Sequence, residues 1–346
     1  MRTTKISNGV NLLVTGGAGF IGSNFIHYIL DKYPDYKIVN LDILTYAGNL
    51  NNLKEIANNP NYVFVKGDIC DYDLVDKIVK ENKINIIINF AAESHNSWAI
   101  VNPSIFFKTN VLGTQNLLEV ARKNNGIRFH HISTCEVYGD LALDSDEKFT
   151  ENSPFLPRTP YNASKAASDL AVRVYFDTFK LPVTISNCSN NYGPYQYPEK
   201  LISLFTTNLL DDKKVPIYKN SQNRREWLHV LDHCRAIDLI IHKGKIGEIY
   251  NIGSGIEQSV EQITDFILKE LGKSDSMKEI VQDRPGHDRR YLLDSSKIKK
   301  ELGWKPEIDF EQGLKETIAW YKNNRAWWEP LKEKNILAEA EWGDKK

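Results

Sequence analysis

The stretch from Val10 to Gly22 reads V-N-L-L-V-T-G-G-A-G-F-I-G and decides the fold of this 346-residue chain. Its first six residues form an apolar run that is typical of a buried strand, and helical periodicity follows over Ser23–Tyr33. Gly16, Gly19 and Gly22 have the spacing that lets a chain turn tightly, bring backbone amides to a pyrophosphate and pack the next helix on the sheet. The stretch therefore predicts a strand, a phosphate-binding turn and a helix.

A carboxylate stands twenty residues beyond that turn. A second apolar run, Lys37–Leu41, ends in Asp42, where a carboxylate can hold the ribose hydroxyls of an adenine dinucleotide. Such a group repels a 2′-phosphate, which favours NAD over NADP. A glycine-rich turn without a ligand is the alternative, and Asp42 argues against it.

Strands and helices continue to alternate along the chain. We expect strands at Tyr62–Lys66, Ile84–Phe90 and Ile127–Ile132, and helices at Asp73–Asn82 and Thr109–Lys123. The last of these helices has Leu112, Leu117 and Val120 on its apolar side. The alternation predicts an α/β fold with a Rossmann-type doubly wound parallel sheet.

Two further strand ends extend the expected cofactor site. Asp68 and Ile69 follow the third strand as a candidate adenine contact, although an aspartate here is more often a helix cap. Ala91 and Ala92 follow the fourth strand, and their small side chains let a dinucleotide lie against the backbone. The residues expected to contact NAD are Gly16, Gly19, Phe20, Ile21, Gly22, Asp42, Asp68, Ile69, Ala91, Ala92, Tyr161 and Lys165.

Reactive side chains gather in a later segment. The run I-S-T-C-E-V-Y-G places a hydroxyl, a thiol and a carboxylate at Thr134, Cys135 and Glu136, just past a strand end, where open α/β sheets bind ligands. Tyr161 and Lys165 lie four residues apart, on one face of a helix. A nearby ammonium favours the phenolate, so this pair suits proton removal from a carbinol.

Composition narrows the class of protein. The 44 basic and 45 acidic residues give a net charge of −1, and they are dispersed, which argues against a nucleic-acid surface. The four cysteines show no CxxC spacing and no Cys/His cluster, so we expect a reduced, cytoplasmic protein without a metal site. No apolar run reaches membrane-spanning length, and the first ten residues lack the apolar core of a signal peptide, so no membrane association is expected.

Several motifs together resemble a known family. They are T-G-G-A-G-F-I-G, A-A-E-S-H, Y-N-A-S-K and N-C-S-N-N-Y-G-P-Y-Q-Y-P-E-K-L-I. They resemble the extended short-chain dehydrogenase/reductases that act on nucleotide sugars, above all the dTDP-glucose 4,6-dehydratase group. The resemblance implies an NAD-binding domain over residues 1–185 and a smaller α/β nucleotide-sugar-binding domain over 186–346, interleaved in space. It also implies a homodimer in which the helices Thr109–Lys123 and Ala163–Phe179 form a four-helix bundle.

The resemblance implies a reaction as well. Tyr161 takes the proton of the sugar 4-hydroxyl while hydride passes from C4 to NAD, with Thr134 hydrogen-bonded to that oxygen and Lys165 holding the ribose. The 4-ketone acidifies the C5 proton, which Glu136 removes, and the C6 hydroxyl leaves as water. Hydride return to C6 completes a 4-keto-6-deoxy sugar. The implied substrate contacts are Ser94, His95, Asn190, Lys200, Leu201, Tyr218, Arg225, Arg284 and His287.

The chain departs from the family pattern at the acid. Where the pattern has an Asp–Glu pair, this sequence has Cys135–Glu136. A thiol is protonated near neutrality and can donate to the leaving hydroxyl. Alternatively, Cys135 is a small filler and water or Glu136 handles the proton. A covalent thiolate is disfavoured because no imidazole stands beside it in the sequence to activate it.

Two further departures concern the substrate. The usual S-H-V-D-R-S run is replaced by one with Asn96, Ser97 and Trp98, and an asparagine usually found near the nucleotide base is matched by Ile256. Dehydratases with cysteine in the acid position resemble those handling UDP-N-acetylglucosamine. We therefore expect that substrate, with a 4-keto-6-deoxy or a 5,6-ene product, and dTDP-glucose as the alternative.

Two other functions compete with a dehydratase. A nucleotide-sugar 4-epimerase needs the Tyr161/Lys165 pair and NAD, but it has no use for a base at C5, so Glu136 argues against it. A non-catalytic NAD-binding sensor has no reason to keep Thr134, Tyr161 and Lys165 together. The sequence therefore favours a hydro-lyase over both.

Overall fold

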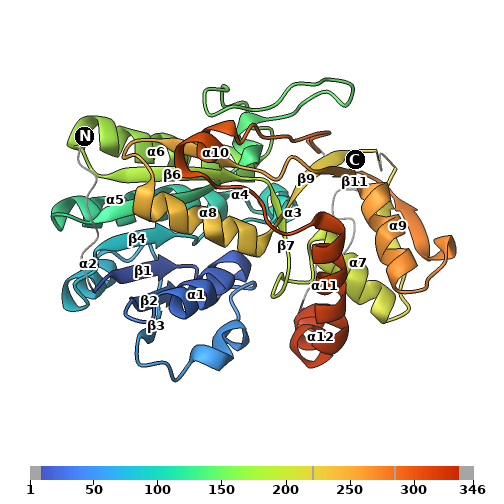
Figure 1. The fold of residues 1–346 in the computed structure, drawn as a ribbon, viewed down its shortest axis with the longest axis horizontal. Coiled ribbons are helices and arrows are strands. Elements are labelled where there is room, and N and C mark those ends of the chain that lie inside the picture. Colours follow the sequence, from blue (N-terminus) through green and yellow to red (C-terminus); the bar gives the residue numbers. More distant parts are fainter. Residues whose placement is uncertain (1–8, 220–221, 284–285, 335–346) are drawn as a thin grey trace.

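The computed structural model describes residues 9–219, 222–283 and 286–334. Its main feature is a seven-stranded parallel sheet with strand order β10-β6-β5-β4-β1-β2-β3 (Figure 1). The strands are β1 (Asn11–Thr15), β2 (Lys37–Asp42), β3 (Tyr62–Lys66), β4 (Ile86–Asn89), β5 (Arg128–Thr134), β6 (Val183–Cys188) and β10 (Ile249–Ile252). The order reverses between β1 and β4, which is where doubly wound sheets bind ligands.

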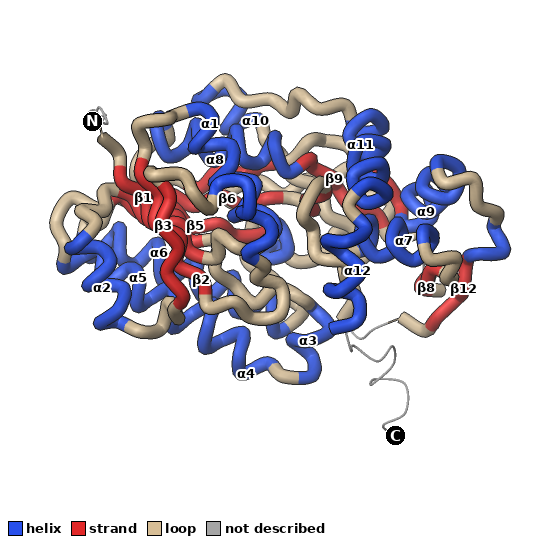
Figure 2. The backbone as a smooth tube through the Cα atoms, turned by 90° about the horizontal axis from the view of Figure 1, so that it is seen from below, coloured by secondary structure: helices blue, strands red, loops and turns tan. Residues whose placement is uncertain are grey.

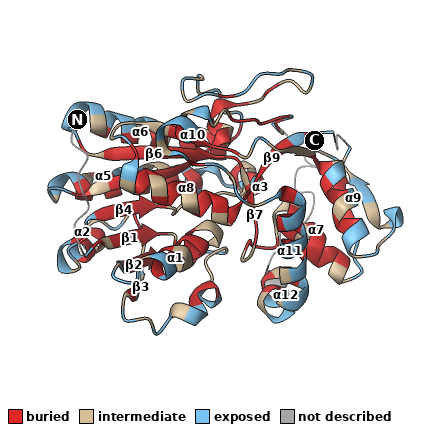
Figure 3. Ribbon diagram, viewed as in Figure 1, coloured by how far each residue is buried: buried red, intermediate tan, exposed pale blue. Residues whose placement is uncertain are grey.

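Helices cover both faces of this sheet, as the view from below shows (Figure 2). One apolar core joins the sheet to α2 (Tyr72–Glu81), α5 (Thr114–Lys123) and α6 (Pro160–Phe179). The core on the other face joins it to α1 (Phe20–Lys32) and α8 (Val230–Lys243). Burial is concentrated in the strands and in the sheet-facing sides of the helices, while the outer sides are exposed (Figure 3). The expected Rossmann-type doubly wound fold is confirmed.

The second lobe is smaller and mixed. It holds β7 (Asn190–Tyr192), β9 (Arg224–His229) and β11 (Glu257–Ser259) in one sheet, and β8 (Val215–Tyr218) and β12 (Lys278–Val281) in another. Its helices are α7 (Leu201–Leu210), α9 (Val260–Glu270), α11 (Phe310–Asn323) and α12 (Arg325–Lys334), whereas α10 (Ser296–Leu302) packs against α8 and β10 of the first lobe. The chain returns to the first sheet for α8 and β10, so the two lobes exchange segments. The expected boundary at residue 185 falls inside β6.

One prediction about the first lobe is wrong. Leu112 was expected on the apolar side of a helix beginning at Thr109, but its side chain is 60% exposed, whereas Leu117 and Val120 are fully buried. The short helices α3 (Asn96–Val101) and α4 (Pro103–Phe106) lead into a π-helical turn, Phe107–Gly113, before α5. The wider π turn shifts the helical register by about one residue, and this rotates Leu112 away from the sheet.

No helix among the described residues is both long and apolar enough to cross a bilayer.

Candidate active site

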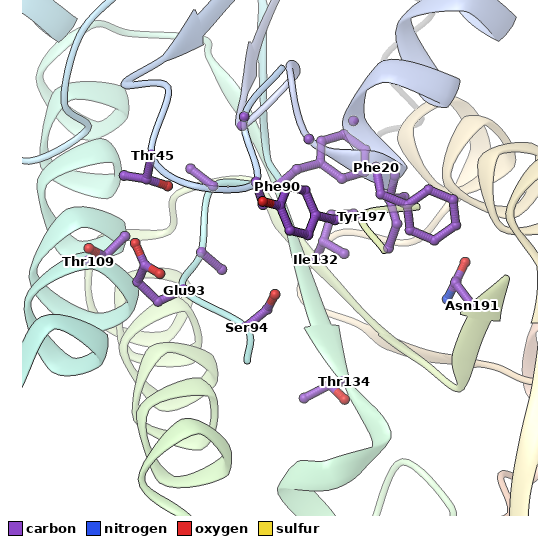
Figure 4. A pocket seen from close by; sticks show the side chains of 18 of the residues that line it. Phe20, Thr45, Phe90, Glu93, Ser94, Thr109, Ile132, Thr134, Asn191 and Tyr197 are labelled. Atoms are coloured by element: carbon purple, nitrogen blue, oxygen red, sulfur yellow. The ribbon is translucent and has the colours of Figure 1, made fainter. Parts of the chain in front are cut away.

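A cavity of about 460 Å³ opens at the carboxyl ends of the parallel strands, between the two lobes (Figure 4). This volume lies in the range of small-molecule and cofactor sites. Eighteen of the sequence-predicted site residues line it: Gly16, Gly19, Phe20, Ile21, Gly22, Asp42, Asp68, Ile69, Ala91, Ala92, Ser94, Thr134, Glu136, Tyr161, Lys165, Asn190, Lys200 and Leu201. The topology thus brings most of the candidate site together.

The glycine turn forms a close-fitting floor to this cavity. Gly16 has a φ of +67°, and a Cβ there would lie 2.6 Å from the backbone nitrogen of Ala91. A Cβ on Gly22 would lie 2.4 Å from the carbonyl oxygen of Gly16. Gly19 precedes α1 without a side-chain cap, so the first helical amides face the cavity unblocked. The cradle fits the pyrophosphate of a dinucleotide.

Asp42 ends β2 at the rim of the same cavity. Its Oδ2 accepts a hydrogen bond from the amide of Ala18 at 2.9 Å, and its Oδ1 accepts one from Leu44 at 2.8 Å. Burial raises the pKa of this carboxyl, while the two amides oppose that shift. Because each carboxylate oxygen keeps a second lone pair, Asp42 can still accept from ribose hydroxyls. The residues present fit NAD.

Thr134 and Tyr161 are the candidate reactive pair. Thr134 is the last residue of β5, and its hydroxyl accepts a hydrogen bond from the amide of Glu136 at 3.2 Å. Tyr161 lies in the first turn of α6, which Thr159 caps through the amide of Asn162. Burial raises the pKa of the Tyr161 phenol well above its usual value, and a hydrogen bond with Thr134 opposes this shift. Two hydroxyls therefore converge where a carbinol oxygen would bind.

Lys165 sits in a buried polar network beneath that centre. Its Nζ donates to the carbonyl of Ile132 at 2.7 Å and lies 3.2 Å from Nε2 of His131. Asp169, one turn further along α6, accepts a hydrogen bond from Ser133 at 2.8 Å. Burial lowers the pKa of Lys165, and burial raises the pKa of Asp169. The sequence reasoning missed His131 and Asp169, although Asp169 follows Lys165 by four residues and so shares its helix face.

Glu136 and its neighbour Cys135 point to different surroundings. Glu136 lines the cavity, and its Oε2 accepts a hydrogen bond from Nδ2 of Asn96 at 2.9 Å. Cys135 is only 1% exposed, lies outside the cavity lining, and belongs to the apolar cluster that includes Val137 and Tyr138. Burial raises the pKa of its thiol well above the usual value. Cys135 is therefore a neutral thiol at neutral pH.

The residues expected at the nucleotide end form a separate group beyond the cavity lining. The Arg225 guanidinium donates to the backbone carbonyls of Arg224, Asp288 and Arg289 and stacks over the ring of Tyr291 at 4.7 Å. Tyr218 and His287 meet edge to face, with ring centroids 5.4 Å apart. His95 lies 3.8 Å from Glu199, again outside the lining. Arg284 lies outside the described residues.

The cavity also has walls that the sequence reasoning did not assign. Glu199 and Tyr197, from the Y-P-E-K stretch, and Thr45, Glu93 and Asn191 all line it; all but Glu199 are labelled in Figure 4. Burial raises the pKa of Glu199 to about 7. The resemblance covered Y-P-E-K, but only Lys200 was taken from it.

A parallel sheet, a glycine cradle at its reversal point and a Thr/Tyr/Lys centre define an extended short-chain dehydrogenase/reductase. The family model for GDP-mannose 4,6 dehydratase matches residues 13–317. The chain belongs to this family and is an NAD-dependent nucleotide-sugar 4,6-dehydratase, a hydro-lyase.

Relatives that share about half of their residues with this chain carry one name. The dTDP-glucose 4,6-dehydratase of Streptomyces niveus is 50% identical over 327 residues, which cover 93% of this chain and 96% of the relative. A Bacillus anthracis dTDP-glucose 4,6-dehydratase solved in complex with NAD is 50% identical, with a TM-score of 0.87, covering 93% of this chain and 99% of that one. One from Streptomyces venezuelae, with NAD and TYD bound, is 48% identical, with a TM-score of 0.90, covering 93% and 100%.

Proposed function

We propose that this enzyme converts dTDP-glucose to its 4-keto-6-deoxy product. The observation that carries the proposal is the identity of about half the residues, over 93% of the chain, to enzymes of that name. The preference for UDP-N-acetylglucosamine drawn from the sequence finds no support among these relatives, which favour the alternative.

Three of the departures that suggested another substrate lie in apolar clusters of this fold. Cys135 lies in one apolar cluster, Trp98 packs against the cluster of Phe106 and Tyr161, and Ile256 packs against the core of the second lobe. None of the three lines the cavity. These positions therefore give little reason to expect a different sugar.

In the proposed reaction the chain's own groups move the protons. The Tyr161 oxygen, whose pKa the Thr134 hydroxyl lowers, takes the proton of the sugar 4-hydroxyl. Lys165 holds the cofactor ribose, and its charge favours the phenolate form of Tyr161. Bound NAD supplies the hydride acceptor for C4 and the hydride donor for C6. Glu136 removes the proton from C5, and the C6 hydroxyl departs as water.

Cys135 is the proposed acid for that water, since burial keeps its thiol protonated. The alternative is that Cys135 only fills space, and its position in the apolar cluster supports this alternative. For a thiol outside the cavity lining to donate, bound substrate has to approach the end of β5 from the Cys135 side. Comparison of Cys135→Ala with Cys135→Asp separates the two roles.

We also propose a homodimer through the faces of α5 and α6. These helices pack together, and large apolar side chains stand exposed on α6 and on the segment that leads into α5: Ile105, Phe107, Leu112, Leu170, Val174 and Phe179. Light scattering on wild type and on a Leu112→Glu/Leu170→Glu double variant tests it. A dimer that becomes monomeric supports the proposal, and a wild-type monomer contradicts it.

Substrate choice is tested by comparing kcat/KM for dTDP-glucose and UDP-N-acetylglucosamine, with water loss followed by mass spectrometry. Faster turnover of dTDP-glucose by at least tenfold is expected. Faster turnover of UDP-N-acetylglucosamine would contradict the proposal and would support the substrate expected from Cys135.

A further inference from the structure

A chain of hydrogen bonds links the proposed base to the helix that carries Tyr161. Oγ1 of Thr159 donates to Oδ1 of Asn96 at 2.7 Å, and Nδ2 of Asn96 donates to Oε2 of Glu136 at 2.9 Å. Asn96 begins α3, Thr159 is the N-cap of α6, and Glu136 lies in the 3₁₀ turn, Cys135–Tyr138, that follows β5. Asn96 and Thr159 are buried, so water competes little for these bonds.

The direction of these bonds follows from the donors. The amide of Asn162 donates to Oγ1 of Thr159 at 3.2 Å, so the Thr159 hydroxyl proton is free to go to Asn96. An oxygen of the Asn96 amide must then face Thr159, and its NH₂ must face Glu136. A flipped amide would set two oxygens against each other at the carboxylate. The network therefore presents a fixed N–H donor to Glu136.

We propose that Asn96 is a positioning residue that holds the Glu136 carboxylate by Oε2 and leaves Oε1 facing the cavity to remove the C5 proton. This inference rests on the proposed role of Glu136 as the base. Within the described residues no hydrogen bond engages Oε1, so it keeps its acceptor capacity.

Thr159, at the other end of this series of hydrogen bonds, fixes the position of Glu136 relative to α6. Thr159 caps α6 two residues before Tyr161, so the base and the proton acceptor for the 4-hydroxyl share one support. The two groups act on adjacent sugar carbons, and a displacement of about 1 Å can lower a rate by about 10²-fold.

Two substitutions of Asn96 distinguish its role as a hydrogen-bond donor from the packing of its side chain. Asn96→Leu keeps the approximate volume and removes both bonds. Asn96→Asp keeps an acceptor for Thr159 but sets a second carboxylate against Glu136. Ser97→Ala, on the same turn of α3, is the matched control for trimming a buried polar side chain there. Glu136→Gln reports on the base itself.

Two steps are measured on holoenzyme with dTDP-glucose. C4 oxidation is followed in single turnover by the absorbance of the reduced cofactor, and C5 proton exchange by NMR in deuterated water across a pH series. Asn96→Leu is expected to slow C5 exchange about tenfold or more while C4 oxidation stays within about threefold. The pH profile of C5 exchange should also change in both Asn96 variants, because each removes the N–H donor that faces Glu136.

The outcomes distinguish this inference from the function on which it rests. If both Asn96 variants keep the wild-type exchange rate and pH profile while Glu136→Gln loses exchange, the base stands and the positioning role is wrong. If Glu136→Gln retains exchange, the base assignment fails, and the inference fails with it. Equal losses in Ser97→Ala would also overturn the role, because any disturbance of that turn would then suffice.

Discussion

Replacing Gly16 by alanine tests two properties of the cofactor-binding turn, its left-handed backbone conformation and its close approach to Ala91. Gly16 has a φ of +67°, and an added Cβ would lie 2.6 Å from the nitrogen and 2.7 Å from the Cα of Ala91. Gly303, at the end of α10, has a φ of +72°, but a Cβ there would meet nothing within 4 Å. The pair therefore compares left-handed strain alone with strain plus a backbone collision.

The expected magnitudes differ accordingly. The left-handed conformation costs a non-glycine residue about 1–2 kcal/mol, so Gly303→Ala should lower the free energy of unfolding by that amount and leave NAD affinity unchanged. Gly16→Ala adds overpacking against main-chain atoms, about 1–3 kcal/mol more. Because Ala91 lines the same cavity, its displacement should weaken NAD binding at least tenfold.

Urea unfolding and calorimetric titration with NAD measure both quantities. If Gly16→Ala matched Gly303→Ala in stability and bound NAD within twofold of wild type, the close approach of Gly16 to Ala91 would have no role in the cradle.

Three further predictions concern the protons. Asp169→Asn removes the carboxylate whose charge opposes the effect of burial on Lys165, so the pKa of Lys165 should fall further. We expect kcat to drop about tenfold at neutral pH and to recover below neutrality. An unchanged pH profile of kcat would contradict this role of Asp169. Cys135→Asp should retain water loss, whereas Cys135→Ala should slow it about tenfold or more without slowing C4 oxidation; equal rates for wild type and the alanine variant would make Cys135 a filler. Burial lowers the pKa of His233 to about 3 and that of His229 to about 4. Below about pH 6.5 both histidines are protonated in the unfolded chain but stay neutral in the folded protein. The free energy of unfolding should therefore fall as the pH drops from about 6.5 toward 4. His233→Gln should flatten that slope, and an unaltered slope in urea titrations would refute the assignment.

The sequence predicted the strands well because each is a short apolar run between turn signals. Tyr62–Lys66 is expected and observed with the same bounds, and the expected strand Lys37–Leu41 is longer by one residue, Asp42. The error at Leu112 arose because a π turn has no compositional signature, so a regular 3.6-residue period was assumed where the helix is wider. Local periodicity cannot report such a change.

The candidate site was predictable where residues follow strand ends. Asp42, Ala91 and Thr134 each end or follow a parallel strand, and such ends meet at one edge of a sheet. The orientation of neighbouring side chains was not predictable in the same way. Cys135 and Glu136 are adjacent in sequence, yet Cys135 lies in an apolar cluster and Glu136 lines the cavity. The two side chains diverge because a 3₁₀ turn begins at Cys135.

The partners of the reactive groups were also out of reach from sequence. Asn96 and Glu136 are forty residues apart, and only the tertiary fold brings the amide to the carboxylate. His131 meets Lys165 for the same reason. Such contacts depend on the register of the sheet and on the angle at which α6 crosses it.

The central claim is that one active site oxidises C4, removes water across C5 and C6, and returns the same hydride to C6. The most direct measurement is NMR of the product formed from dTDP-glucose carrying deuterium at C4, with wild-type enzyme in ordinary water. A C6 methyl group that carries the label from C4 is expected. Label that remains at C4, or an exocyclic alkene in place of the methyl group, would contradict the central claim.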